Sequence, residues 1–308
     1  MSWLAIVIIA YLFLALVNLI DKFLLENVLG NPKVYAFLIS VLGSVVLLAA
    51  PWFLIWPGWF LFIWQMVVGA LFPLALILMF AALKHGDASK ITVLIGGIIP
   101  IFTIIFSSFF FQERFTANQW GGIVFLLIGT FAIALISGHQ SGSQKKQASN
   151  NRAAFWLSCF SALTYALFFI GTKYAYNHHD FFSSFIWIRI GSLFLALLLL
   201  VGRKNRREIL GSLKSGQPSG TNKNRLIIIG NQALGALAFI LQNYAISFGS
   251  VAILNALQGV QYAFLLIFGW LFTIFNPKII KEDLSRRVIW QKIAAIIMIT
   301  VGLYFIAA

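Results

Sequence analysis

Amide and phenol side chains stand inside apolar stretches of this sequence. One stretch carries Asn255, Gln258, Gln261 and Tyr262. Their spacing of i, i+3, i+6 and i+7 keeps them on one side of an α-helix. Such groups donate and accept hydrogen bonds without carrying charge. The stripe is therefore suited to binding a neutral or zwitterionic solute.

The same residue types recur in other apolar stretches. Asn231 and Gln242 are eleven residues apart, so they share a helix face, and further candidates are Tyr11, Asn18, Gln65 and Tyr165. Hydrogen bonding between helices, worth about 0.6–2 kcal/mol per contact, explains any one of them. We interpret the whole set as the lining of a polar cavity, because packing alone does not require so many amides.

Two basic residues, Lys173 and Arg189, lie within or at the end of apolar stretches. Both are candidates for contacting an anionic group of a solute. The alternative for Lys173 is snorkelling to the membrane surface, and for Arg189 an interfacial anchor. Because the middles of the apolar stretches hold no acidic residue, the carboxylate relay typical of proton coupling is missing. The sequence therefore favours uniport or exchange.

The sequence indicates neither a metal site nor an enzyme. Its four histidines fall in polar breaks, without paired ligands on one helix face. It has no phosphate-binding glycine motif and no nucleophile elbow. Its single cysteine, Cys159, excludes an intrachain disulfide. We predict no catalytic residue, no metal and no cofactor.

The composition is that of a membrane protein. Of 308 residues, 61% are hydrophobic and 10% are charged, against about 25% charged in soluble proteins. The apolar runs repeatedly reach the length that crosses a bilayer core of about 30 Å. The net charge of +14 comes from residues scattered among short loops, so we assign it to membrane topology and not to nucleic-acid binding. We predict an all-α polytopic membrane protein with the lipid bilayer as its partner.

Polar breaks divide the chain into ten predicted transmembrane helices. They lie at 2–20, 34–55, 59–83, 89–111, 118–137, 153–176, 182–202, 226–246, 250–275 and 288–307. A Ser/Gly/Gln-rich linker at 138–152 separates residues 1–137 from residues 153–308, five helices each. A basic loop at 203–225 interrupts the second unit. Neither linker has enough apolar residues to fold alone.

The two units resemble each other. The stretch "AALKHGDASKITVLIGG" (81–97) aligns with "YAISFGSVAILNALQGV" (244–260), which places Gly96 opposite Gly259. An odd number of helices per unit turns the second copy upside down, so we predict two inverted five-helix repeats. We expect Gly96 and Gly259 to be close-packing sites between helices. Pro73 and Pro100 are expected to bend their helices and assist gating.

The basic residues are unevenly divided between the two sides of this topology. All but three of the 22 Lys and Arg fall in odd-numbered loops, the exceptions being Arg114, Lys173 and Arg189. Basic loops remain in the cytoplasm. The skew therefore predicts that both termini face outward.

The chain resembles the EamA type of the drug/metabolite transporter superfamily. The resemblance covers essentially the whole chain. It rests on the two five-helix units, on a lysine ending the first helix of each, and on the stretch 82–130, with its Pro100 and the turn "ERFT" (113–116). The second copy departs from this pattern, because Ala263 replaces the proline. The resemblance implies location in the cytoplasmic (inner) membrane and, by family habit, both termini inside.

We predict a secondary transporter that moves a small metabolite, an amino acid or related amphipathic solute, by alternating access. A lipid-linked substrate translocase is one alternative, since an aliphatic wall with Lys173 and Arg189 suits a lipid phosphate. The other is a non-transporting scaffold or receptor, whose basic loop would bind lipid headgroups or a protein. The sequence indicates no particular oligomeric state.

Overall fold

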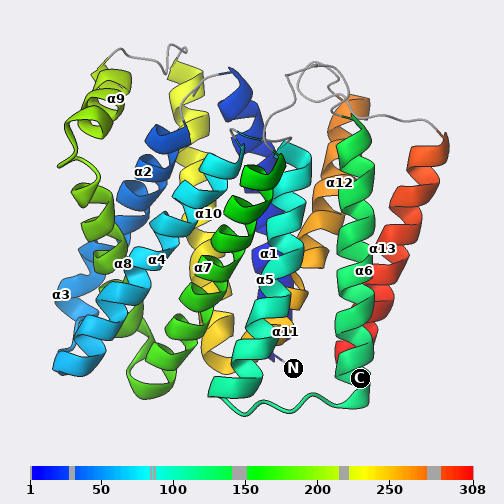
Figure 1. The fold of residues 1–308 in the computed structure, drawn as a ribbon, viewed down its shortest axis with the longest axis horizontal. Helices are drawn as coiled ribbons and strands as arrows, with labels where there is room; N and C mark the ends of the chain where they lie inside the picture. The colour runs from blue at the N-terminus through cyan, green and yellow to red at the C-terminus, as the bar shows by residue number, and fades with distance from the viewer. Residues whose placement is uncertain are drawn as a thin grey trace.

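The computed structural model describes residues 2–27, 32–83, 85, 88–140, 151–214, 222–275 and 286–307. All regular secondary structure in these ranges is helical (Figure 1). The elements are α1 (Ser2–Asn27), α2 (Pro32–Gly43), a 3-10 helix (Ser44–Ala49), α3 (Ala50–Phe53), α4 (Trp59–Leu83), α5 (Ala88–Phe110), α6 (Ala117–Gln140), α7 (Asn151–His178), α8 (Phe181–Leu198), α9 (Arg203–Lys214), α10 (Asn222–Phe248), α11 (Val251–Ala256), α12 (Gln258–Phe275) and α13 (Arg286–Ala307).

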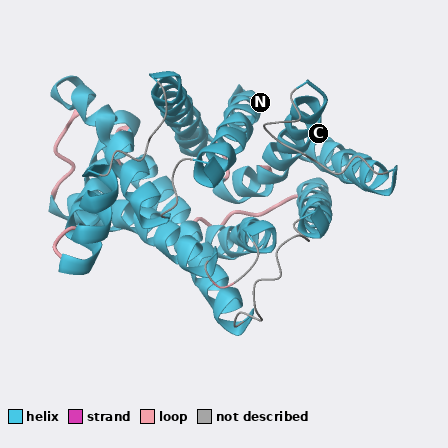
Figure 2. Ribbon diagram, turned by 90° about the horizontal axis from the view of Figure 1, so that it is seen from above, coloured by secondary structure: helices cyan, strands magenta, loops and turns pink. Residues whose placement is uncertain are grey.

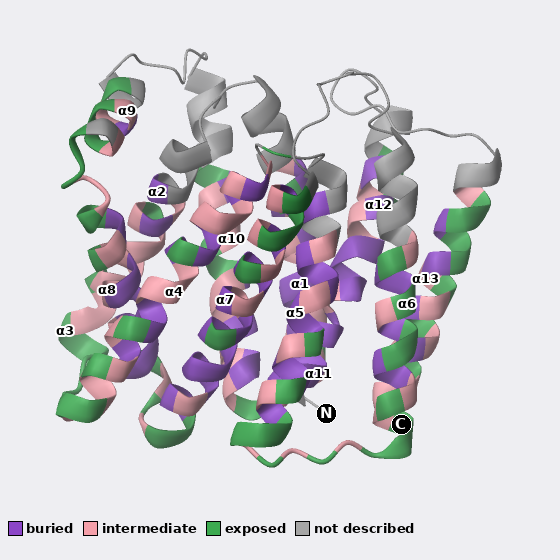
Figure 3. Ribbon diagram, viewed as in Figure 1, coloured by how far each residue is buried: buried purple, intermediate pink, exposed green. Residues whose placement is uncertain are grey.

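Six segments of the described chain are long and apolar enough to cross a membrane: Trp3–Ile20, Trp59–Leu83, Arg152–His178, Phe181–Leu198, Val251–Leu271 and Ile289–Ala307. Three other predicted crossings coincide with the shorter apolar helices Ile39–Phe53, Leu94–Phe110 and Ala117–Ala132. The tenth coincides with α10. Large apolar side chains such as Trp52, Phe109 and Trp290 remain exposed, on surfaces that suit lipid (Figure 3). The predicted class, an all-helical multi-pass membrane protein, is confirmed.

The long helices run up and down in one bundle. In Figure 1, α1, α4, α6, α8 and α12 run toward the end where α9 lies, and α2, α5, α7, α10 and α13 run away from it. Both termini lie at the end opposite α9. Figure 2 shows the same bundle from above. Helices that correspond in the two predicted units thus run in opposite directions.

Equivalent helices of the two halves make equivalent contacts with the opposite half. α1 packs against α10, as α4 packs against α7. α12 contacts α1, as α5 contacts α7, and the fifth predicted helix, α6, pairs with the tenth, α13. Most of the large contacts are therefore made between helices of different halves.

Glycines allow the closest of these contacts. A Cβ on Gly122 of α6 would lie 2.7 Å from the carbonyl oxygen of Gly302 on α13. A Cβ on Gly302 would lie 2.8 Å from the carbonyl oxygen of Gly122. The two backbones touch, as at small-residue seams in membrane proteins.

The predicted helices 34–55 and 250–275 are not continuous in the structure. The first changes from α2 to a 3-10 helix before α3, where Pro51 has no N–H and would crowd the carbonyl one turn earlier. The second breaks at Leu257, between α11 and α12. Near that break, Asn255 Nδ2 donates to the carbonyl of Val251 at 3.1 Å and competes with the regular backbone pattern.

The prediction of an unstructured basic loop at 203–225 is wrong for its first half, which forms α9. Ile209 is 1% exposed and packs against Phe37 of α2 and Ala196 of α8. This apolar contact ties a largely basic and polar segment to the bundle. Residues 215–221 lie outside the described chain, as do residues 141–150 of the predicted linker.

Candidate functional site

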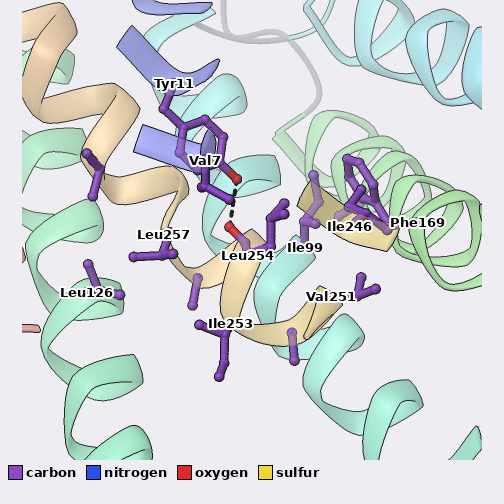
Figure 4. Packing of buried hydrophobic residues seen from close by; sticks show 14 of the residues in the cluster. Val7, Tyr11, Ile99, Leu126, Phe169, Ile246, Val251, Ile253, Leu254 and Leu257 are labelled. Atoms are coloured by element: carbon purple, nitrogen blue, oxygen red, sulfur yellow. Dashed lines mark hydrogen bonds between the residues drawn. The ribbon is translucent and has the colours of Figure 1, made fainter. Parts of the chain in front are cut away.

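Tyr11 joins the first helix of the chain to the broken segment. Its side chain is fully buried, and its hydroxyl donates to the carbonyl of Leu254 in α11 at 2.6 Å (Figure 4). Carbonyls in the last turn of a helix have no partner within it. Tyr11 therefore supplies the bond that the end of α11 needs, within a buried apolar cluster that also contains Val7 and Leu257.

Three further polar side chains are linked to Tyr11, Gln242 and Tyr262 directly and Tyr165 through Tyr262; we call the four residues the tyrosine–glutamine cluster. The amide of Gln242 forms a hydrogen bond with the Tyr11 phenol. Tyr262 is close enough to interact electrostatically with both Tyr11 and Tyr165. The cluster is drawn from α1, α7, α10 and α12, so it lies where both halves of the chain meet.

Gly96 makes room for this cluster. A Cβ at Gly96 would collide with the Tyr262 hydroxyl, so the absence of a side chain on α5 lets the phenol reach inward. Its counterpart Gly259 packs against a different residue, because a Cβ there would lie 2.6 Å from Thr130 Oγ1. Both glycines thus sit at close helix contacts. Pro73 and Pro100 lie buried inside α4 and α5, and neither helix is interrupted there.

Arg189 lies among aromatic rings, a group we call the arginine–phenylalanine cluster. Its guanidinium carbon is 3.9 Å from the ring centroid of Phe239, 5.4 Å from that of Phe185 and 5.6 Å from that of Phe72. Arg189 is 7% exposed. Ring faces attract a cation electrostatically. Phe72 also contacts Tyr165, with centroids 6.2 Å apart, so the two clusters adjoin.

Buried amides accompany the arginine. Gln65 Nε2 donates to Ser184 Oγ at 3.0 Å. Its Oε1 is buried without a hydrogen-bond partner among the described atoms. Asn243 accepts from the Tyr176 hydroxyl at 3.0 Å. The sequence analysis predicted Gln65 as a site residue but missed Tyr176 and Asn243. Asn243 directly follows the predicted Gln242, so a second amide at that point of the apolar stretch could have been noticed.

The remaining predicted site residues lie on α1, α10, α11 and α12. Of the stripe on the broken segment, Tyr262 joins the cluster, whereas the Asn255 amide binds its own helix. Gln258 begins α12 half-buried, and Gln261 is buried. Asn231 is buried in α10, and Asn18 is exposed on α1.

Lys173 holds the junction between α10 and α11. It is 9% exposed, and its Nζ donates to the carbonyls of Ile246 at 2.9 Å and Ser247 at 3.1 Å. Cations are favoured at such carbonyl ends. This arrangement replaces the snorkelling interpretation, since the ammonium is turned inward. The side chain of its predicted counterpart, Lys22, lies outside the described set.

The Glu-Arg turn between α5 and α6 reaches the same junction. Glu113 Oε2 accepts from Ser250 Oγ at 2.5 Å. Ser250 in turn caps α11 by accepting from the N–H of Ile253 at 3.3 Å. Glu113 also interacts electrostatically with Lys173. The turn of the first half therefore fixes the break between two helices of the second half.

Residues 1–135 match the model of a family described as the EamA-like transporter family. The match confirms the predicted resemblance over residues 1–135. The same match supports a membrane transporter of the drug/metabolite type. No curated protein matches the chain.

Solved structures agree on the fold. One, titled "Crystal structure of protein", superposes with a TM-score of 0.66 at 16% sequence identity. The match covers 99% of this chain and 94% of the other. At that identity the likeness shows the fold alone. The likeness in fold spans nearly the whole chain.

The family is one of transporters, not of enzymes. Within the described residues, no group of three or more His, Cys, Asp or Glu side chains could hold a metal ion. What the clusters offer chemically is hydrogen bonding, aromatic surface and one buried cation. These are means of binding a solute.

Proposed function

We propose that the protein is a secondary transporter of a small amphipathic metabolite, such as an amino acid or a related solute. The observation that carries the proposal is the tyrosine–glutamine cluster. Polar groups this deep in a membrane protein are costly unless they serve a pathway or pair with one another. Here phenols and an amide from four helices of both halves converge, beside the rings that surround Arg189.

Alternating access between two inverted five-helix repeats is the mechanism we propose. Corresponding helices run in opposite directions in Figure 1, and their contacts exchange between halves, as such repeats require. The break at Leu257 supports the same reading, because discontinuous helices commonly form substrate sites in transporters. Rocking of the halves would expose the cluster to each side in turn.

The charge distribution supports an orientation. The end of the bundle that carries α9 also holds exposed Arg152, Arg203, Arg206 and Arg207, and the opposite end carries Glu113, Arg114 and Asp180. Positive residues mark the cytoplasmic side. We therefore place both termini outside a cytoplasmic membrane.

The test is uptake into liposomes that contain the purified protein, measured with a panel of radiolabelled amino acids and related zwitterions. Gln242→Leu removes the amide beside Tyr11 and should abolish uptake while the protein remains folded. Gln291→Leu, at an exposed position of α13, is the matched control and should keep wild-type uptake. Equal uptake by both variants would refute the assigned site.

Two further measurements separate the alternatives. A pH gradient should leave uptake unchanged, because the described spans carry no mid-membrane carboxylate to relay protons. Strong gradient-driven accumulation would overturn uniport or exchange. Movement of a fluorescent lipid between leaflets, with no uptake of any small solute, would favour the lipid-linked translocase instead.

A further inference from the structure

The helix α9 presents a basic face that the transport proposal does not use. Arg203, Arg206 and Arg207 are all exposed. Their spacing of i, i+3 and i+4 puts them on one side of the helix. Like charges at these spacings repel one another and disfavour a helix. The segment is nevertheless helical over Arg203–Lys214.

Apolar packing explains how α9 is held. Ile209 packs with Phe37 of α2 and Ala196 of α8, and Val41 and Leu200 cover this small cluster. It lies two residues beyond Arg207, which on a helix is nearly the opposite side. Arg206 lies three residues before Ile209 and therefore on an adjoining side, but all three arginines remain exposed while Ile209 is buried.

The position of α9 decides which partner this face would meet. The preceding membrane span ends at Leu198, and α9 starts at Arg203 after a short turn. It lies at the level where the long helices end (Figure 1). A basic face at this depth lies beside lipid headgroups. By the charge distribution it lies on the cytoplasmic side, where anionic lipids attract juxtamembrane Lys and Arg.

We infer that α9 is a binding surface for anionic phospholipid headgroups of the adjacent leaflet. Charge complementarity supplies the attraction, and the buried Ile209 keeps the arginines in place without the lipid. The surface belongs to the second half alone, because the turn after α3 in the first half, residues 54–58, carries no charge. The inference requires a membrane protein and does not depend on transport.

The experiment titrates the purified full-length protein in detergent with phosphatidylglycerol or phosphatidylcholine and follows the thermal unfolding midpoint. Phosphatidylglycerol should raise the midpoint at concentrations where phosphatidylcholine does not. Neutralising each arginine should weaken apparent phosphatidylglycerol binding about fivefold, the equivalent of about 1 kcal/mol per basic residue near an anionic surface. The variant R203Q/R206Q/R207Q should lose the preference.

Single variants provide the matched control. Arg207→Gln should weaken the effect, whereas Arg114→Gln, an exposed arginine at the opposite end, should not. Salt at about 0.5 M should abolish the preference of the wild type, because it screens exposed charges. If the triple variant does not fold, the two single variants and the salt titration decide.

Several results would overturn the inference. The triple variant could keep the wild-type preference, or both lipids could stabilise the protein equally. Glycerol phosphate, the soluble headgroup, could act as strongly as the lipid, which would indicate a site for free anions. Stabilisation by soluble polyglutamate alone would indicate an acidic protein partner instead.

Discussion

Arg189 shows how this protein accommodates a charge inside the membrane. Three phenylalanine rings from α4, α8 and α10 surround its guanidinium, which interacts electrostatically with the phenol of Tyr176. A planar, weakly hydrated guanidinium stacks on rings as an ammonium does not. The site therefore specifies arginine and not any cation. A basic group held in this way can attract an anionic group of a solute without a protein carboxylate.

Tyr11 offers the clearest test at the level of one residue. Tyr11→Phe keeps the ring and removes the hydroxyl that donates to Leu254. The carbonyl then stays buried without that donor, so we expect a loss of about 0.6–2 kcal/mol, as measured for hydrogen bonds between membrane helices. Thermal unfolding in detergent measures it. Tyr304→Phe, at a position 69% exposed, is the control and should be neutral; equal unfolding midpoints for both variants would contradict the assigned bond.

Between elements, the seam of α6 and α13 contains adjacent glycines with different surroundings. A Cβ on Gly122 would meet Ile306 and the carbonyl of Gly302, whereas a Cβ on Gly121 would meet nothing within 4 Å. Gly122→Ala should therefore destabilise the protein by about 1–3 kcal/mol through overpacking. Gly121→Ala should be neutral or stabilising by up to about 1 kcal/mol, because alanine favours a helix.

The measurement for this pair is again the thermal unfolding midpoint of the purified variants in one detergent. The two substitutions add the same methyl group, one residue apart on one helix. They differ only in the side of α6 that receives it. A larger loss from Gly121→Ala than from Gly122→Ala would show that α6 is rotated relative to the structure.

The elements that the sequence predicted well are those decided by length and hydrophobicity. Those properties are enough for the helical class and for most helix positions. The break at Leu257 and the helix α9 were missed, because each depends on contacts with distant residues. Ile209 belongs to a largely basic segment, and the sequence does not show that it packs against Phe37 and Ala196.

The candidate site was predicted in part for a similar reason. Polar residues in apolar stretches are visible in a sequence, and Tyr11, Gln242 and Tyr262 were found that way. A sequence does not show which face of each helix meets which neighbour. Asn255 thus proved to bind its own helix, and the rings around Arg189 carried no polar signal.

Orientation is a property of the whole molecule, and it can be tested with cysteine labelling. The background is Cys159→Ser, which removes the single native thiol. Ala117→Cys lies exposed at the end that carries the termini, and Gly211→Cys lies exposed on α9 at the other end. An impermeant maleimide on intact cells should label position 117 and should label position 211 only after permeabilisation. The reverse pattern would place the termini in the cytoplasm.

The pairing of α6 with α13 also has a consequence for biosynthesis. The two touching glycines lie on the fifth long helix of the first half and on the last helix of the chain. When the ribosome has just synthesised α6, more than half of the protein has not yet been made. Its glycine face must wait in the lipid, or against the insertion machinery, until α13 arrives. Membrane insertion of α13 is therefore the step that completes the packing of α6. A chain that ends before α13 leaves α6 without its main neighbour.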